Sequence, residues 1–316
     1  MMTVRDATGR VSAALGGLSD PARGHLAMLG FAVMVAGSFS LGALAANLIA
    51  PAAINAARFA IAAALLGVLC LAGPGLHRSQ FHAPWRYLVL GGLFAAYFVL
   101  MFEGLKTAPP VATSAVFTLT PLMTALFGYL LLRQVLSWRM VLGLAVGAFG
   151  ALWVIFRGEM SALFGFHVGR GEAIYFLGCA AHALFTPMLR LLNRGEPALV
   201  STFAVMSGGF LLLLVWGWAD LRATDWLALP LIVWVTLIYV AVFASAMTFF
   251  LLQYAAMRLP SAKVMAYTYL VPSFVILWEV ALGNSLPSGL VLPGVVMSAV
   301  ALMILLKDEG VRGPRV

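Results

Sequence analysis

Four ionisable side chains lie inside long apolar stretches of the sequence, where a charge is costly and usually serves a function. They are Arg58, Glu103, His182 and Glu279. One basic and two acidic groups at a similar depth predict an ion pair between Arg58 and either Glu103 or Glu279. Such a pair could hold helices together, or it could act as a gate or as an anchor for a zwitterionic solute.

A carboxylate that lacks a charged partner in a medium of low dielectric constant holds a proton more tightly than it does in water. We therefore predict that Glu279 is a proton-coupling residue, with Glu103 as the second candidate. The alternative for Glu103 is a place at the water interface, paired with Lys106. His182 could shuttle protons, or it could be neutral and hydrogen-bonded to a neighbour.

Prolines interrupt the segments that position these groups. Pro187 follows His182 and Thr186 in one apolar segment, and a proline at mid-depth frees a backbone carbonyl in helices that tend to line a cavity. Pro121 and Pro272 fall in the middle of two other segments. We expect all three prolines to act as helix hinges.

Aromatic residues recur at helical spacing in two segments. One patch includes Tyr97 and ends near Glu103; the other stripe contains Tyr267 and Trp278 at steps of three or four residues. Such stripes are usually packing surfaces, but if they face inward they suit a flat or aromatic solute. Thr118 offers a neutral hydroxyl in the fourth segment, unless it bonds to its own helix carbonyls.

Composition places the chain in a membrane. Its 316 residues are 63% hydrophobic and 9% charged, with a mean hydropathy of +1.02. A soluble domain has roughly 25% charged residues, so much of this surface must face lipid. The net charge of +8 does not indicate nucleic acid, because the basic residues are scattered singly. Segments long enough to span a bilayer are predicted at 26–46, 52–72, 86–106, 109–131, 138–156, 171–192, 197–217, 230–255, 261–282 and 288–306.

The chain also contains an internal repeat. Pro109 and Pro121 recur as Pro260 and Pro272, shifted by 151 residues in each case. Five spans in each half make the second half enter the membrane from the opposite side. The predicted fold is therefore an all-α integral membrane protein with ten transmembrane helices, arranged as two inverted five-helix repeats. Its predicted parts are a tail at 1–25, repeats at 26–157 and 170–306, and a tail at 307–316.

Basic residues predict the orientation. Fourteen of the 19 Lys and Arg residues fall in the tails and in loops on the side of the N-terminus, and four fall in loops on the other side. Positive charge favours the cytoplasmic side, so both termini are expected in the cytoplasm. The polar N-terminal stretch is expected to be retained, because the first apolar run is long enough to span.

Two stretches, together with Arg58-Phe59, resemble the EamA-type repeats of the drug/metabolite transporter superfamily; they are APPVATSAVFTLTPLMTALFGYLLLRQVLSWRMVLGLAVGAFGALWV and LPSAKVMAYTYLVPSFVILWEVALGNSLPSGLVLPGVVMSAVALMI. The resemblance extends from about residue 26 to 306. It implies ten helices, a bacterial inner-membrane location, and a cavity lined by the first four helices of each half, with the fifth and tenth peripheral. The chain departs from the family's common Gly-Glu pairs, with Arg133-Gln134 and Asn284-Ser285 in their place.

The repeat and the resemblance together predict a secondary active transporter working by alternating access. Its first-choice solute is an amino acid or related metabolite, moved outward; the alternative is a flat heteroaromatic vitamin or drug-like solute, such as riboflavin taken up. An enzyme is disfavoured, because no phosphate-binding loop, metal-ligand spacing or catalytic triad is found. A channel is disfavoured too, because only the fourth segment has a polar stripe. We expect no cofactor, metal or nucleic acid to bind. The expected partners are a small-molecule solute, the lipid bilayer and protons, and the protein is expected to be a monomer or a homodimer.

Overall fold

The computed structural model describes residues 19–156, 168–259, 261–285 and 289–307, and all regular structure in these ranges is helical. Nine helices in this part of the chain are long and apolar enough to cross a membrane, and a tenth apolar helix is shorter. The predicted ten-helix fold is therefore confirmed. The tail predicted at 307–316 lies outside the described residues, apart from Lys307.

Each half contributes five membrane helices in chain order. The first half contains α2 (Asp20–Ala45), α3 (Pro51–Ala72), α4 (Trp85–Leu105), the pair α5 (Pro110–Phe117) and α6 (Thr120–Leu132), and α7 (Trp138–Ile155). The second half contains α9 (Arg170–Leu192), α10 (Ala198–Trp216), the run α12 (Leu231–Ala241), η2 (Val242–Met247) and α13 (Thr248–Ala256), the run α14 (Ser261–Ala266), η3 (Tyr267–Leu270) and α15 (Val271–Ala281), and α16 (Leu292–Lys307). Short helices lie between them: η1 (Arg78–Phe81), α11 (Trp218–Ala223) and η4 (Gly289–Val291).

The first membrane helix begins earlier than the apolar pattern predicts. It starts at Asp20, inside the segment assigned to the N-terminal tail. Ser19 caps it by accepting a hydrogen bond from the Ala22 N–H at 3.4 Å, and Pro21 lies in the first turn, where its missing N–H costs nothing. Local capping chemistry, not hydrophobicity, determines this boundary.

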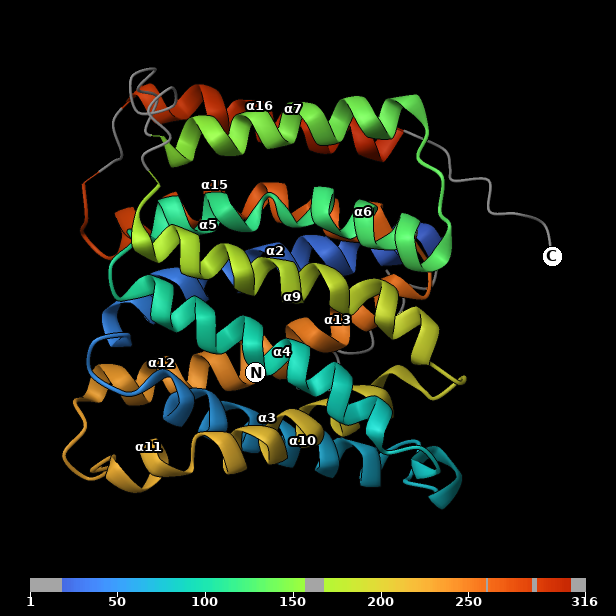
Figure 1. The fold of residues 1–316 in the computed structure, drawn as a ribbon, viewed down its shortest axis with the longest axis vertical. Helices are drawn as coiled ribbons and strands as arrows, with labels where there is room; N and C mark the ends of the chain where they lie inside the picture. Colours follow the sequence, from blue (N-terminus) through green and yellow to red (C-terminus); the bar gives the residue numbers. More distant parts are fainter. Residues whose placement is uncertain (1–18, 157–167, 260, 286–288, 308–316) are drawn as a thin grey trace, which may run out of the picture.

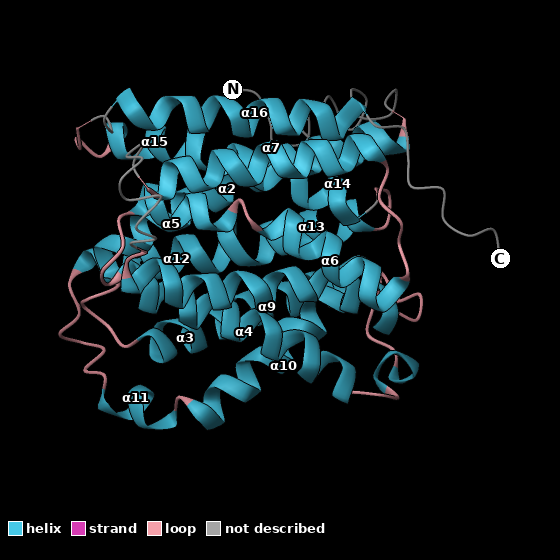
Figure 2. Ribbon diagram, turned by 45° about the horizontal axis from the view of Figure 1, so that its top comes forward, coloured by secondary structure: helices cyan, strands magenta, loops and turns pink. Residues whose placement is uncertain are grey.

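The helices run side by side with their ends at two opposite faces (Figure 1). Helices α7 and α16 pack on each other at one edge, and α3 and α10 lie at the opposite edge (Figures 1 and 2). Between these edges lie α2, α4, α9 and α13. The fifth and tenth helices are thus peripheral, as the resemblance implies.

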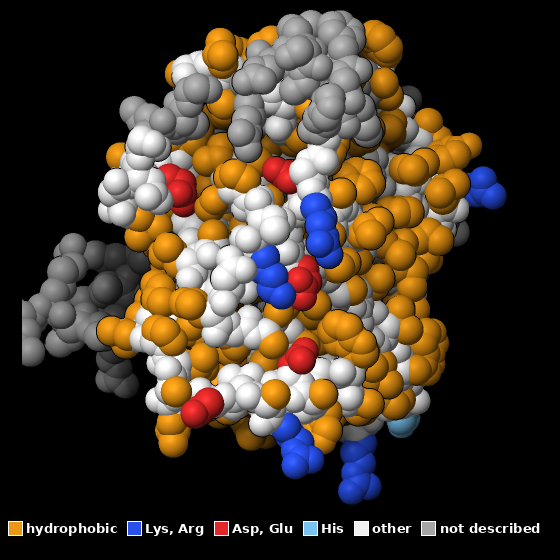
Figure 3. All heavy atoms as spheres, turned by 60° about the vertical axis from the view of Figure 1, so that its left-hand side comes forward, with side chains coloured by type: hydrophobic (Ala, Val, Ile, Leu, Met, Phe, Trp, Pro, Cys, Tyr) orange, Lys and Arg blue, Asp and Glu red, His pale blue; other side chains and the backbone are white. Residues whose placement is uncertain are grey.

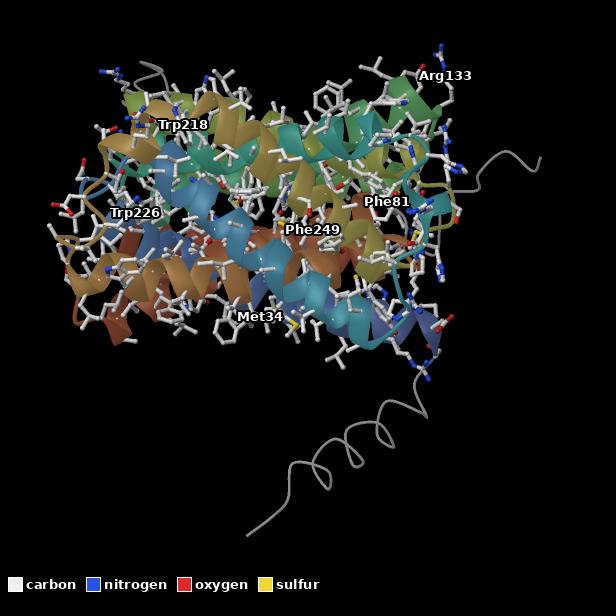
Figure 4. All side chains as sticks on the ribbon, turned by 90° about the horizontal axis from the view of Figure 1, so that it is seen from below. Met34, Phe81, Arg133, Trp218, Trp226 and Phe249 are labelled. Carbon is white, nitrogen blue, oxygen red and sulfur yellow. The ribbon has the colours of Figure 1, made fainter. Side chains whose placement is uncertain are left out.

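Polar atoms concentrate at the two ends of the bundle. Figure 4 shows nitrogen and oxygen atoms gathered near Trp218 and Trp226 at one end and near Arg133 and Phe81 at the other, with Phe249 between them. At the end where α4 finishes, charged side chains lie among uncharged atoms, and hydrophobic side chains cover the flanks (Figure 3). This distribution is the one that a bilayer requires.

Glycine permits the closest helix approach beside the centre. A Cβ atom on Gly91 of α4 would lie 2.3 Å from the backbone nitrogen of Gly209 in α10, well inside van der Waals contact. Only glycine allows these two backbones to meet, as in small-residue interfaces of other membrane helices. The contact fixes α10, of the second half, against α4, of the first.

Both repeats break their fourth helix at the repeated proline. Pro121 lies in the first turn of α6, after α5 ends at Phe117, and Pro272 lies in the first turn of α15, after η3. Proline has no N–H to donate to the carbonyl four residues earlier. The Thr120 hydroxyl instead donates to the Phe117 carbonyl at 2.6 Å. Two of the three predicted hinge positions, Pro121 and Pro272, therefore coincide with breaks in the helices.

Candidate functional site

A small buried cavity lies midway along the helices. The volume open to the centre of a water molecule is about 10 Å³, which leaves room for roughly one water. Every residue that lines the cavity is at least nine-tenths buried, so the cavity lies inside the bundle. The lining residues are Phe31, Val35, Ser38, Phe94, Tyr97, Phe98, His182, Ala244, Thr248 and Phe249.

The cavity is formed by equivalent helices from the two halves. Helices α2 and α4, the first and third of the first half, supply six of the lining residues. Helix α9 and the run η2–α13, the first and third of the second half, supply the other four. The cavity thus lies where the inverted repeats meet, and a movement of one half against the other would change its shape.

Aromatic rings form most of the cavity wall. Phe94 meets Phe249 edge-on at 4.3 Å between ring centroids, and Tyr97 lies 4.5 Å from the His182 ring. The Tyr175 hydroxyl hydrogen-bonds to the Tyr97 hydroxyl at 3.0 Å. Tyr97 and His182, two of the residues predicted from sequence, are therefore brought together at the cavity.

His182 presents a polar atom without a partner. Its side chain is buried at mid-length of α9, and its Nδ1 atom has no hydrogen-bond partner among the described residues. The predicted alternative of a histidine hydrogen-bonded to a neighbour is therefore not seen at this nitrogen. An unpaired buried nitrogen at a cavity is suited to bind water or a polar group of a solute.

Arg58 is fully buried beside the same cavity. Its Nη2 donates to the Ala244 carbonyl at 2.6 Å, its Nε donates to the Ser245 hydroxyl, and its guanidinium carbon lies 3.4 Å from the centre of the Phe98 ring. Its Nη1 has no partner in the described part of the chain. Two of the residues that it contacts, Phe98 and Ala244, line the cavity.

The predicted ion pair of Arg58 with a glutamate is wrong. Glu103 pairs with Lys106 at 2.9 Å, the alternative foreseen for it, and Glu279 accepts from the Asn284 amide at 2.8 Å. Both carboxylates lie near helix ends, whereas Arg58 points between helices toward η2. The three groups were predicted at a similar depth in the membrane, but similar depth does not make side chains on different helices face one another.

The partner of Arg58 arises from a π-helical turn. In η2 the backbone forms wider turns, which free carbonyl groups from the regular α-helical pattern, and such turns are frequent at functional sites. The Ala244 carbonyl accepts from Arg58 at this point. Nothing in the local sequence indicates a π-turn, so Ala244 and Ser245 are site residues that sequence reasoning missed. Phe31, Val35, Ser38, Thr248 and Phe249 are likewise newly placed at the cavity.

Pro187 lies inside α9, five residues beyond His182. It cannot donate to the Ala183 carbonyl, and the Thr124 hydroxyl of α6 does so instead at 3.3 Å. The proline thus creates a polar link between α9 and α6 rather than an open break.

Three predicted site residues lie away from the cavity. The Thr118 hydroxyl donates to the Ala115 carbonyl of its own helix at 2.6 Å. Tyr267 hydrogen-bonds through its hydroxyl to His25 Nδ1 at 3.1 Å, and Trp278 meets Tyr239 edge-on at 5.7 Å. The aromatic stripe of the ninth segment is therefore a packing surface against α2 and α12.

Comparison with known proteins gives consistent results. The model of the EamA-like transporter family matches residues 22–156 and 169–307. The uncharacterized transporter YyaM of Bacillus subtilis (strain 168) is 25% identical over 264 residues, which cover 82% of this chain and 86% of YyaM. A protein of known crystal structure is 20% identical and has the same fold, with a TM-score of 0.66 over 94% of this chain and 99% of that one.

Proposed function

The chain belongs to the EamA-like transporter family and is a multi-pass membrane transporter; we propose that it is a secondary active transporter working by alternating access. The observation that supports this mechanism is the small buried cavity between the two halves. A metabolite does not fit in space for one water, so loading requires the halves to move apart. Inverted repeats can do this in two symmetric ways, one opening to each side.

The helix breaks at Pro121 and Pro272, together with Pro187, are the proposed hinges. Pro121 and Pro272 lie at equivalent places in the two halves, and Pro187 lies in α9, the helix that carries His182 to the cavity. A change of bend at these prolines would move the lining helices. The mechanism does not need ATP, because the energy comes from the solute gradient or from exchange with protons.

The proposed solute is a small organic metabolite, with an amino acid or a relative exported from the cytoplasm as the first choice. A buried guanidinium beside aromatic walls supports this choice, because it matches a charged group next to an apolar body. The second candidate is a flat heteroaromatic solute such as riboflavin, which the aromatic rings around Phe94 favour. The proposed location is the bacterial inner membrane with both termini in the cytoplasm, as a monomer or homodimer.

Flux through purified protein in liposomes tests the proposal. Vesicles loaded with labelled amino acids or riboflavin are assayed for efflux and uptake, with and without a pH gradient. We expect carrier-type exchange, in which unlabelled solute on the far side accelerates movement of the label. If none of these solutes moves in either direction, the proposed solutes are wrong. If the protein instead converts a solute into a product, the transport mechanism is wrong.

A further inference from the structure

We propose that Arg58 is the anion-binding group of the transport site and that the solute is an organic carboxylate with a small apolar or aromatic body. This inference rests on the proposed function and selects among its solutes. A carboxylate would bind through the free Nη1 edge of the guanidinium, while the other edge stays attached to η2.

The hydrogen bonds of Arg58 leave one side of the group unused. A guanidinium has five N–H donors in a planar fork that matches a carboxylate. Nε and Nη2 are held by Ser245 and the Ala244 carbonyl, which orients the plane, and Phe98 covers one face. Nη1 is left without an acceptor although the whole side chain is buried. A fixed, half-satisfied guanidinium is already arranged to bind an anion.

The protein supplies no counter-ion for this charge within the described residues. The carboxylates that pair with a basic group do so elsewhere: Glu103 with Lys106, Glu196 with Arg86, and Asp20 with Arg258. A buried cation without a negative partner is unfavourable in a low-dielectric site, so an anion from outside gains the interaction that the fold leaves unmade. Neutral acceptors and the Phe98 ring reduce this cost without removing the charge.

The position of Arg58 also limits the rest of the solute. The Phe98 ring beneath the guanidinium and the Ala244 backbone that it binds both line the cavity. Arg58 itself is not among the lining residues, but these two contacts connect it to a space walled by Phe94, Tyr97 and Phe249. We infer that a carboxylate reaches Nη1 from this space once the lining helices move apart. His182 also lines this cavity, and its unpaired Nδ1 could meet a second polar group of the solute. This arrangement favours amino acids and arylalkanoic acids over uncharged heteroaromatics.

A purely structural role for Arg58 makes a different prediction. If Arg58 only fastened α3 to η2, its loss would lower stability but would not change which solutes bind. The discriminating quantity is therefore the difference in affinity between an acid and its uncharged amide, not the stability of a variant.

The test compares 3-phenylpropionate with 3-phenylpropanamide on the full-length protein purified in detergent. Apparent dissociation constants come from the rise of the unfolding temperature with probe concentration. We expect the acid to bind wild type at least tenfold more tightly than the amide. Arg58→Gln should weaken acid binding by roughly 10- to 100-fold, the usual value of a charge-assisted contact. Arg58→Lys should recover only part of the affinity, because an ammonium keeps the charge but lacks the planar fork that binds η2 on one edge and a carboxylate on the other.

Arg139→Gln is the control, because it removes the same charge from an exposed position at the start of α7 and should bind like wild type. The comparison of acid and amide on wild type does not depend on whether Arg58 variants fold. Equal binding of acid and amide, or an acid preference that survives Arg58→Gln, would overturn the inference. Riboflavin transport with no carboxylate binding would overturn it and leave the transporter proposal standing. Arg58-dependent carboxylate binding without flux of any solute would support the assignment of Arg58 as an anion-binding group and overturn the transporter proposal.

Discussion

The hydroxyl group of Thr124 in α6 donates a hydrogen bond, 3.3 Å long, to the carbonyl of Ala183, the group that Pro187 leaves without a helical partner in α9. Both residues are buried, so this carbonyl depends on Thr124 rather than on water. A backbone group that proline leaves unpaired in a helix of the second half is thereby satisfied by a side chain of the first half.

This link predicts a non-additive pair of substitutions. Thr124→Val should lower the free energy of unfolding by about 1 kcal/mol, because the carbonyl loses its donor inside the membrane. In the Pro187→Ala background the same substitution should cost less, because the alanine introduced there can supply the N–H that proline lacks. A double-mutant cycle in mixed micelles measures the coupling. Equal costs in the two backgrounds would show that the hydrogen bond does not replace the helical one.

The approach of Gly91 to Gly209 predicts a strong response to one methyl group. Gly91→Ala places a Cβ 2.3 Å from a backbone nitrogen, where no side-chain rotation can relieve it. The unfolding free energy should fall by about 1–3 kcal/mol. Gly30→Ala is the matched control, because its Cβ would meet only a leucine methyl at 3.6 Å and should not lower stability. Similar losses for both variants would refute a tight α4–α10 contact.

A buried ion pair at the start of α4 predicts a pH dependence of stability. Arg86 Nη2 lies 2.7 Å from Glu196 Oε1, and the Arg194 N–H donates to the same carboxylate at 2.8 Å. Burial raises the pKa of the Glu196 carboxyl, but these hydrogen bonds and the Arg86 charge together lower it by more. The pKa of Glu196 therefore lies below its ordinary value.

Because this pKa is lower in the folded state, the stabilisation is complete above the unfolded pKa, near 4.3, and is lost as the pH falls through the folded value. Unfolding midpoints measured from pH 7 to pH 3 should therefore drop more steeply below about pH 5 for wild type than for Glu196→Gln. Asp220→Asn, in the short helix α11, should keep the wild-type profile. Parallel curves for wild type and Glu196→Gln would contradict the assigned role.

Proton coupling is predicted to involve Glu279, with Glu103 as the second candidate. Glu279→Gln should abolish solute movement driven by a pH gradient and leave exchange without a gradient intact, because the neutral amide cannot carry a proton. Glu103→Gln is measured alongside it, in the same liposomes. If the pH-driven rate of Glu279→Gln equals that of wild type, Glu279 has no coupling role.

The sequence predicts the transmembrane helices of this protein better than it predicts the contacts around the central cavity. The membrane helices follow from apolar segments of sufficient length, and the helix breaks follow from the prolines at 121 and 272. Both are local properties of the chain, which neighbouring helices do not alter. The environment of Arg58 depends on a π-turn in another helix, which has no signature in the local sequence. Helical spacing places Tyr267 and Trp278 on one face but does not say whether that face meets a cavity or another helix. His182 was found because ionisable groups inside apolar segments are rare, and Tyr97 because aromatic residues recur at helical spacing in its segment.

The most direct test of alternating access around the central cavity is a structure of the protein with a solute that it transports. We expect the solute to lie between Tyr97, His182 and Phe249, with the helices that line the cavity moved apart to admit it. A transported solute bound elsewhere, such as in the lipid-facing groove between α4 and α10, with the central cavity still closed, would contradict it.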